Sequence, residues 1–367
     1  MIDEGQKERK ILAVIPARSG SKSVVDKNIR LIDGKPMLAY SIEHAKRSRY
    51  ISRVIVSTDS ETYAQIAKEY GAQVPFLRPA EYATDTALDY DVFYHALTFL
   101  EQEENYIPEL VVQLRPTYPI RDVEDIDRMI GQMLADETID SMRCIAPAKE
   151  IPYKMWLCEE MDPAGQQANG KCTAGVSQTA DPAFSLLRPL MTDIEECYNM
   201  PRQQLPKAYY QNACIDVIRT EVITKQHSMS GKKIMGYRMK ENFDIDTEEE
   251  FKKAEEFLKI KNGGKRFVFD IDGVIAGFRS GLDYAAALPN RKMIEIINRL
   301  YEWGNEIILF TARGYVTGID WRKVTEQQMR DWGLRYHELH FGKPNADYYV
   351  DDKMLDMNWL YECFEGR

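Results

Sequence analysis

One set of side chains in the last third of the chain is suited to the chemistry of phosphate esters. The set comprises Asp270 and Asp272 in FVFDIDGVI, Thr311 in IILFTARG, Lys343 in FGKPNADYY, and Asp351 and Asp352 in YVDDK. A carboxylate that attacks a phosphate monoester is repelled by the phosphate, and a lysine together with Mg²⁺ neutralises that charge. A second carboxylate protonates the leaving alcohol and later activates water. These residue types therefore predict a site that hydrolyses a phosphate ester.

Each piece of this set has a structural interpretation when it is taken alone. An Asp-x-Asp-Gly sequence is often a turn, a threonine at a strand end is often a cap, and Asp-Asp-Lys is often a solvated surface. All of them occur in order and at predicted strand ends, which favours the functional interpretation. Together they resemble the four motifs of the haloacid dehalogenase-like phosphatases, over roughly residues 265–355.

The phosphatase resemblance implies a role for each residue. Asp270 would be the nucleophile and Asp272 the general acid and base, while Thr311, the adjacent Ala312 and Lys343 would bind the phosphate. Asp351 or Asp352 would hold Mg²⁺ alongside Asp270 and Asp272. The stretch between Asp272 and Thr311 is too short for a large cap domain.

A second candidate site begins in the sequence IPARSGSKSVVDKN at residues 15–28, directly after the apolar run ILAV. A loop with small, hydroxyl and basic residues after a buried strand can wrap phosphates. It contains no G-x-x-x-x-G-K-[ST] motif and no G-x-G-x-x-G motif. Three further stretches are notable: FLRPAEYATDTA (76–87), QLRPTYPIR (113–121) and NFDIDTEEEF (242–251).

These stretches together resemble the acylneuraminate cytidylyltransferases, the CMP-sialic acid synthetases, over about residues 10–258. The matching segments are Ile15–Asn28, Val56–Asp59, Arg78–Thr86, Leu114–Arg121 and Asp244–Thr247, with NMPRQQLPKAYYQN at 199–212. The resemblance implies transfer of CMP from CTP to a hydroxyl of a sugar acid, with release of pyrophosphate. It also implies a homodimer or a higher homo-oligomer.

In this interpretation, Arg18, Lys22 and Lys27 bracket the triphosphate, and Asp244 and Asp246 hold Mg²⁺ against it. Further contacts to the nucleotide or the acceptor are expected from Ala17, Ser19, Asn28, Arg78, Ala83, Asp85, Thr86, Arg115, Gln211 and Asn212. Asn28 and the segment from Ala83 to Thr86 are assigned to the cytidine by resemblance. The structural alternatives are a solvated basic turn and a helix cap formed by the two aspartates.

Two departures from the family pattern bear on the acceptor. Arg115 stands where sialic acid enzymes carry Gln, and Asp216 stands where an aromatic residue is usual. An arginine offers a fixed charge and a planar fork of donors for a carboxylate or a phosphate. The acceptor is therefore either an acidic sugar of the nonulosonic type or a phosphorylated or phosphonate acid, which would give a CDP- or CMP-phosphonate-type product.

Strand-like and helix-like segments alternate along most of the chain, which predicts an α/β protein with two domains. Strands are expected at 11–17, 53–59, 110–116, 266–272, 305–314 and 346–352, and helices at 35–48, 60–71, 122–134, 247–262, 290–304 and 321–333. The first domain (1–260) is expected to be a nucleotidyltransferase-type, Rossmann-like mixed sheet. The second (265–367) is expected to be a small capless haloacid dehalogenase-like α/β domain. Residues 148–205 lose the alternation and are predicted to be an insertion, either a lid or a dimer arm.

Composition limits the partners. The formal net charge is −10, which disfavours binding of nucleic acid. No run of eighteen apolar residues occurs, and the first residues lack the apolar core of a signal peptide, so we expect no membrane contact and a cytoplasmic location. The six cysteines are scattered, which favours reduced thiols. We expect a bifunctional enzyme of surface-glycan precursor synthesis, such as capsule or lipopolysaccharide; the alternative is that one domain is non-catalytic.

Overall fold

The computed structural model describes residues 9–21, 24–148, 150–159, 186–239, 243–277, 283–344, 346 and 353–364. The chain forms two compact units: Met1–Cys144 with Ala213–Arg367, and Ile145–Asn212. The strand expected at 346–352 lies outside the described residues except for Ala346. Within the described part of the chain, none of the helices has both the length and the apolar character needed to span a bilayer.

A six-stranded mixed sheet forms the centre of the first unit, in the order β10-β6-β9-β5-β1-β4. Its strands are β1 (Ile11–Pro16), β4 (Arg53–Ser57), β5 (Leu110–Leu114), β6 (Ser141–Pro147), β9 (Tyr209–Arg219) and β10 (Ile234–Arg238). β1 pairs in parallel with both β4 and β5, whereas β5 pairs antiparallel with β9. The expected mixed sheet is therefore confirmed, and its parallel part is the part that carries the predicted phosphate loop.

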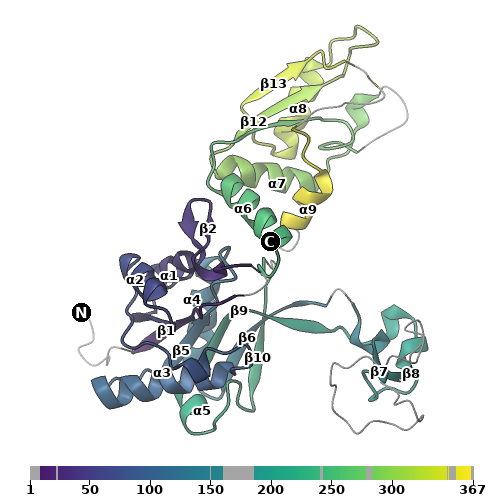
Figure 1. Ribbon diagram of the computed structural model, residues 1–367. Helices are drawn as coiled ribbons and strands as arrows, with labels where there is room; N and C mark the ends of the chain where they lie inside the picture. Colours follow the sequence, from purple (N-terminus) through teal and green to yellow (C-terminus); the bar gives the residue numbers. More distant parts are fainter. Residues whose placement is uncertain are drawn as a thin grey trace, which may run out of the picture. The chain divides into compact units, whose positions relative to one another are not determined.

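Helices cover both faces of this sheet because successive side chains of a buried strand point to opposite faces. The helices are α1 (Met37–Arg47), α2 (Glu61–Glu69), α3 (Asp89–Glu104), α4 (Val123–Ala135) and α5 (Thr220–Thr224). Ile11, Ala13 and Ile15 of β1 pack with α1, α2 and α4, while Leu12 and Val14 pack with α3 and α5. Figure 1 shows the two groups of helices on opposite sides of the sheet. A small hairpin, β2 (Leu31–Ile32) with β3 (Lys35–Pro36), precedes α1.

The helix α6 (Glu248–Lys261) follows the carboxylate pair of the predicted site. Thr247 is its N-cap: the Thr247 hydroxyl accepts from the Glu250 backbone N–H at 3.2 Å, and the Glu250 carboxylate accepts from the Thr247 N–H at 2.9 Å. This reciprocal capping box satisfies two backbone donors at the helix start. The alternative that Asp244 and Asp246 serve as the cap is wrong, because Thr247 takes that position.

Replacing Thr247 by alanine removes the cap and should lower the free energy of unfolding by about 1 kcal/mol. Urea unfolding followed by circular dichroism measures the change. Glu256→Ala, an exposed change in the middle of α6, is the matched control and should leave stability within about 0.5 kcal/mol of the wild type. Equal effects of the two substitutions would contradict the assignment of the cap.

A separate three-stranded parallel sheet contains β11 (Arg266–Phe269), β12 (Glu306–Thr311) and β13 (Glu338–Phe341), in that order. The helices that follow α6 are α7 (Arg291–Glu302), α8 (Arg322–Trp332) and α9 (Met357–Phe364). Buried residues of all three helices share one apolar cluster with Phe269, Ile307 and Leu309 of the strands. The strands expected at 266–272 and 305–314 and the helices expected at 290–304 and 321–333 are confirmed, while β13 was not predicted.

The unit Ile145–Asn212 contains the predicted insertion at 148–205. Its described part holds an antiparallel pair, β7 (Trp156–Glu159) and β8 (Leu186–Pro189), and short 3₁₀ helices at Pro152–Lys154, Cys197–Asn199 and Arg202–Gln204. The Trp156 and Tyr198 rings lie 4.5 Å apart between centroids. Whether this unit is a lid or a dimer arm stays a prediction.

Candidate functional site

The loop after β1 is fastened to the end of β4. The Ser19 backbone N–H and hydroxyl donate to the two carboxylate oxygens of Asp59 at 2.8 and 2.6 Å. Burial opposes ionisation of Asp59, but these hydrogen bonds outweigh it and lower the pKa of the carboxyl. The Asn28 side-chain amide donates to the Arg18 carbonyl at 2.9 Å and closes the loop. The carboxyl ends of parallel strands are the usual ligand edge of an α/β sheet, and this loop lies there.

Arg18 joins the loop to the segment at 78–86. Its guanidinium lies 2.7 Å from the Asp85 carboxylate, and both side chains are partly exposed. Arg78 is only 5% exposed; it donates from Nε to the Ser57 hydroxyl at 3.0 Å and also to the Ser57 carbonyl. Burial lowers the pKa of Arg78 to about 10. Arg78 therefore anchors its segment to β4, and its contact with a nucleotide stays a prediction.

The carboxylate pair lies close to the same loop. Lys27 Nζ is 2.8 Å from Asp246, and the Tyr118 hydroxyl donates to Asp244 at 2.9 Å. Burial raises the pKa of Asp244, and the neighbouring charge of Asp246 adds to the shift although Tyr118 opposes it. A divalent cation would favour the ionised form of such a pair.

The pair fits a cation site that is completed from outside the protein. Within the described residues, no group of three or more His, Cys, Asp or Glu side chains is placed to hold a metal ion. Mg²⁺ commonly uses one or two carboxylates and takes its other ligands from phosphates and water. Asp244 and Asp246 match that pattern.

Arg115 and Asp216, the two departures from the family pattern, lie on the neighbouring strands β5 and β9 or just beyond them. Each forms an ion pair with a residue of opposite charge. Arg115, just beyond β5, forms an ion pair with Asp89 at the start of α3, and Gln113 donates to the same carboxylate at 3.2 Å. Asp216 is the cross-strand partner of Gln113 and lies 2.7 Å from Arg143. Burial raises the pKa of Asp216, while the charges of Arg143 and Arg115 oppose the shift.

Removing Arg143 should strongly destabilise the fold, because Asp216 is fully buried and would lose its counter-charge. We expect Arg143→Met to lower the free energy of unfolding by about 3–5 kcal/mol. Guanidinium unfolding measures the loss, and adding Asp216→Leu should recover part of it. Arg128→Met removes an exposed ion pair with Asp125 and is the matched control. A loss no greater than that of the control would show that the buried pair contributes little.

The candidate phosphatase residues also come together at strand ends. Lys343 forms an ion pair with Asp270, whose carboxylate also accepts from the Ile271 backbone N–H at 2.8 Å. Thr311 is fully buried; its carbonyl accepts from the Lys343 N–H at 3.1 Å, and its hydroxyl accepts from the Arg313 N–H at 3.2 Å. Asp270, Thr311 and Lys343 therefore meet as the sequence predicts.

Arg313 is a residue that the sequence analysis missed. It lies just after β12, and its Nε and Nη2 donate to the two oxygens of Asp272 at 2.8 and 2.7 Å. The remaining guanidinium nitrogen, Nη1, donates to the Gln328 side chain of α8 at 2.6 Å, and this hydrogen bond orients the guanidinium group. The sequence TARG offered one signal, an arginine two residues after the threonine that was predicted to bind phosphate; the structure shows that this arginine is buried, where it needs a carboxylate partner.

The remaining predicted residues are distributed as follows. Ala17 donates its N–H to Ser57 at 2.9 Å; Ala83 and Thr86 lie in the segment held by Arg18 and Arg78; and Ala312 lies between Thr311 and Arg313. Gln211 is exposed and Asn212 is buried, both on β9. Lys22, Asp351 and Asp352 lie outside the described residues, and their roles stay predictions.

The loop at 15–28 lies at the carboxyl edge of a mixed α/β sheet, and acidic residues lie close to it. This arrangement is typical of nucleotide-binding enzymes. The chain belongs to the cytidylyltransferase family, whose family model matches residues 12–270. The prediction that the first domain is a cytidylyltransferase is thereby confirmed. The match ends near the start of the candidate phosphatase motifs, so the phosphatase resemblance stays a prediction.

Curated relatives cover the same part of the chain. Post-translational flagellin modification protein B of Campylobacter coli is 31% identical over 69% of this chain and 96% of its own length. The CMP-N,N'-diacetyllegionaminic acid synthase of Legionella pneumophila is 31% identical over 68% of this chain and 97% of its own length. An N-acylneuraminate cytidylyltransferase of Escherichia coli is 42% identical over 37% of this chain and 30% of its own length.

Proposed function

We propose that the chain transfers CMP from CTP to a hydroxyl of an acidic sugar of the nonulosonic type, and that residues 265–367 hydrolyse a phosphate monoester. One observation supports the transfer of CMP. Three parts of the chain lie together: the loop at 15–28, the segment at 78–86 and the carboxylate pair of Asp244 and Asp246. The named products and substrates of the curated relatives support an acceptor of this class.

The transfer forms one bond and breaks one bond at the α-phosphate of CTP. The acceptor oxygen bonds to the α-phosphorus, the bond from that phosphorus to the bridging oxygen breaks, and pyrophosphate leaves while the hydroxyl proton passes to solvent. Arg18 and Lys27, together with Lys22, supply positive charge to the phosphates. Asp244 and Asp246 would hold Mg²⁺, which when bound neutralises further charge on the triphosphate. Asn28 fixes the loop that presents these groups.

The ion pair between Arg115 and Asp89 favours a free acid over a phosphorylated or phosphonate acid. A cation whose charge is already compensated offers less attraction for the additional negative charge of a phosphate. Its remaining donors still suit a single carboxylate. This observation supports the sialate-like acceptor over the CDP- or CMP-phosphonate-type product.

A panel of acceptors distinguishes a free sugar acid from a phosphorylated or phosphonate acid as the substrate. Pyrophosphate release is measured with CTP and Mg²⁺ for free nonulosonic acids, for the same acids carrying a phosphate, and for small phosphonates, with the wild type and Arg115→Gln. We expect turnover on free acids by both proteins. Turnover confined to phosphorylated or phosphonate acceptors, and lost in Arg115→Gln, would overturn the free-acid assignment.

For the second activity, Asp270 would attack the ester phosphorus while the bond to the alcohol oxygen breaks and Asp272 gives that oxygen a proton. Water activated by Asp272 would then cleave the aspartyl phosphate and release inorganic phosphate. Asp270, Asp272 and Asp351 or Asp352 would hold Mg²⁺, which when bound offsets the phosphate charge. Thr311 and Lys343 bind and neutralise the phosphate in this scheme.

The two activities together fit a precursor that loses a phosphate before it is activated with CMP, as in the synthesis of capsule or lipopolysaccharide sugars. We place both reactions in the cytoplasm and propose a homodimer or a higher homo-oligomer as the assembly. Phosphate release and pyrophosphate release from one preparation, each measured with its own substrate, test this pairing. A preparation with only one of the two activities would instead support a chain with one non-catalytic domain.

A further inference from the structure

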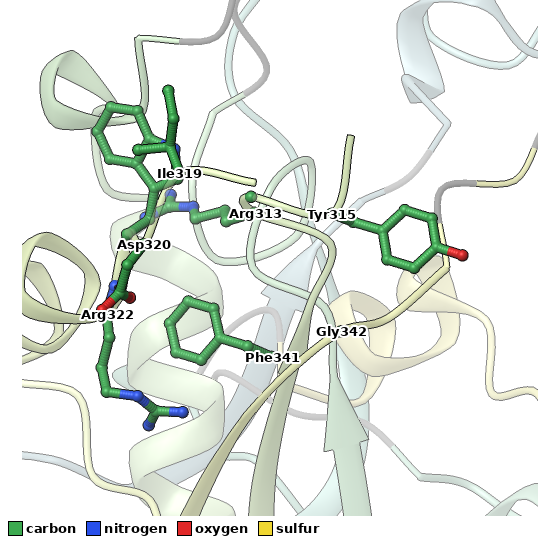
Figure 2. Close-up of a pocket in the computed structure, with 9 residues that line it drawn as sticks. Arg313, Tyr315, Ile319, Asp320, Arg322, Phe341 and Gly342 are labelled. Atoms are coloured by element: carbon green, nitrogen blue, oxygen red, sulfur yellow. The ribbon is translucent and has the colours of Figure 1, made fainter. Parts of the chain in front are cut away.

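A hollow of about 220 Å³ lies beside the candidate phosphatase residues, between the loop at 313–322 and the end of β13. Figure 2 shows the side chains that line it. Pockets that bury drug-sized ligands measure roughly 300–1,000 Å³. This hollow is smaller than that range, so its occupant is a small group and not a whole nucleotide.

The walls of the hollow continue directly from the strands that carry the phosphate-binding residues. Thr311 and Phe341 are register partners in β12 and β13, and Phe341 is a wall residue two positions before Lys343. Arg313 is also a wall residue, and the same side chain holds Asp272 at 2.7 Å. A substrate with its phosphate near Thr311 and Lys343 can therefore place its organic part in this hollow.

The lining is of a kind that recognises sugars. The Arg322 guanidinium lies 4.6 Å from the centroid of the Phe341 ring, and the Asp320 carboxylate lies at the same rim (Figure 2). The Trp321 indole nitrogen is a buried donor with no partner among the described residues. Aromatic rings pack against the C–H faces of sugars, and carboxylates and N–H donors bind their hydroxyls. A guanidinium provides a planar fork for a carboxylate.

The loop is folded tightly enough to keep this lining in place. Gly314 has φ +81°, and a Cβ at this position would lie 2.3 Å from the Ile319 carbonyl oxygen. A side chain could be admitted only by moving the backbone. The Asp320 carboxylate also accepts from the Arg322 N–H at 2.9 Å, which fixes the start of α8. A wall with these constraints is organised before the substrate arrives.

We propose that this hollow binds the organic part of the phosphatase substrate and that the substrate is the monophosphate of a sugar acid, with Arg322 pairing its carboxylate. The inference rests on the proposed phosphatase function and adds the substrate class to it. The Arg322 side chain is about half exposed; its guanidinium lies 3.8 Å from Glu326 and over the Phe341 ring, which leaves it accessible to a ligand at the rim of the hollow.

The test compares two phosphate esters that differ in the carboxylate. Phosphate release is measured for N-acetylneuraminate 9-phosphate and for glucose 6-phosphate, with the wild type, Arg322→Gln and the control Arg330→Gln, an exposed arginine of the same helix. Arg322→Gln should raise KM for the sugar-acid ester about tenfold or more, with kcat and the glucose 6-phosphate reaction unchanged. Arg330→Gln should match the wild type.

The outcomes separate the inference from the function on which it rests. If the wild type hydrolyses the esters and Arg322→Gln affects both equally or neither, the sugar-acid assignment is wrong while the phosphatase stands. Preference of the wild type for glucose 6-phosphate would overturn the assignment in the same way. If no ester, including p-nitrophenyl phosphate, releases phosphate in a reaction that Asp270→Asn abolishes, the proposed phosphatase function itself fails.

Discussion

Replacing Asp244 by asparagine should lower pyrophosphate release from CTP by about 10²-fold or more, with little change in stability. The Asp244 carboxylate is partly buried, next to Asp246 and close to the loop at 15–28. Its charge is therefore well placed to hold a cation against the phosphates, and an amide of the same shape lacks that charge. A continuous assay for pyrophosphate, run over a range of Mg²⁺ concentrations, measures the effect.

Glu249→Gln is the matched control, because Glu249 is an exposed carboxylate in the first turn of α6 and has no place in the site. It should retain wild-type activity, and both variants should unfold at similar urea concentrations. Wild-type turnover by Asp244→Asn would show that the carboxylate pair has a structural role only. A large loss of stability in Asp244→Asn would mean that the kinetic effect reports misfolding.

Replacing Asp270 by asparagine should reduce phosphate release by about 10³-fold or more, because the amide cannot act as the nucleophile. Pyrophosphate release from CTP should be unchanged in the same preparation. Glu295→Gln, an exposed carboxylate of α7, is the matched control and should keep both activities. Phosphate release measured with a sugar-acid monophosphate and pyrophosphate release measured with CTP give the two readouts.

Residual phosphate release by Asp270→Asn close to the wild-type rate would remove Asp270 from the nucleophile position. A parallel loss of pyrophosphate release would contradict the independence of the two sites. Both results differ from that of an inactive C-terminal region, in which the wild type itself would release no phosphate.

The strands β1, β4 and β5 and the helices α1, α2 and α4 were predictable because their signals are local, whereas α3 and the strands β6 and β10 of the same sheet were not predicted. The run ILAVIP is uniformly apolar, as a strand buried on both faces must be, and becomes β1. β13 was missed because ELHF is short and alternates charged with apolar residues, a pattern that also suits a loop. The sequence left the two aspartates among the candidate caps of α6, and the geometry assigns the N-cap to Thr247 instead.

The partners within the candidate site could not be predicted, because they are far apart in sequence. Lys27 and Asp246 are 219 residues apart, and Arg313 and Asp272 are 41 residues apart. The sequence indicates that charged residues lie at strand ends, but the sheet order decides which ends meet. Arg115 is an example. From its residue type we predicted that it binds an anionic group of the acceptor, and the structure shows that it also forms an ion pair with Asp89.

Pyrophosphate release by the full chain, with CTP, Mg²⁺ and N-acetylneuraminate or another free nonulosonic acid, is the most direct measurement of the proposed activity. We expect release only when the acid is present, in a one-to-one ratio with a product whose mass is that of the acid joined to CMP. No release with any free nonulosonic acid, from a folded preparation that binds CTP, would contradict the proposed transfer.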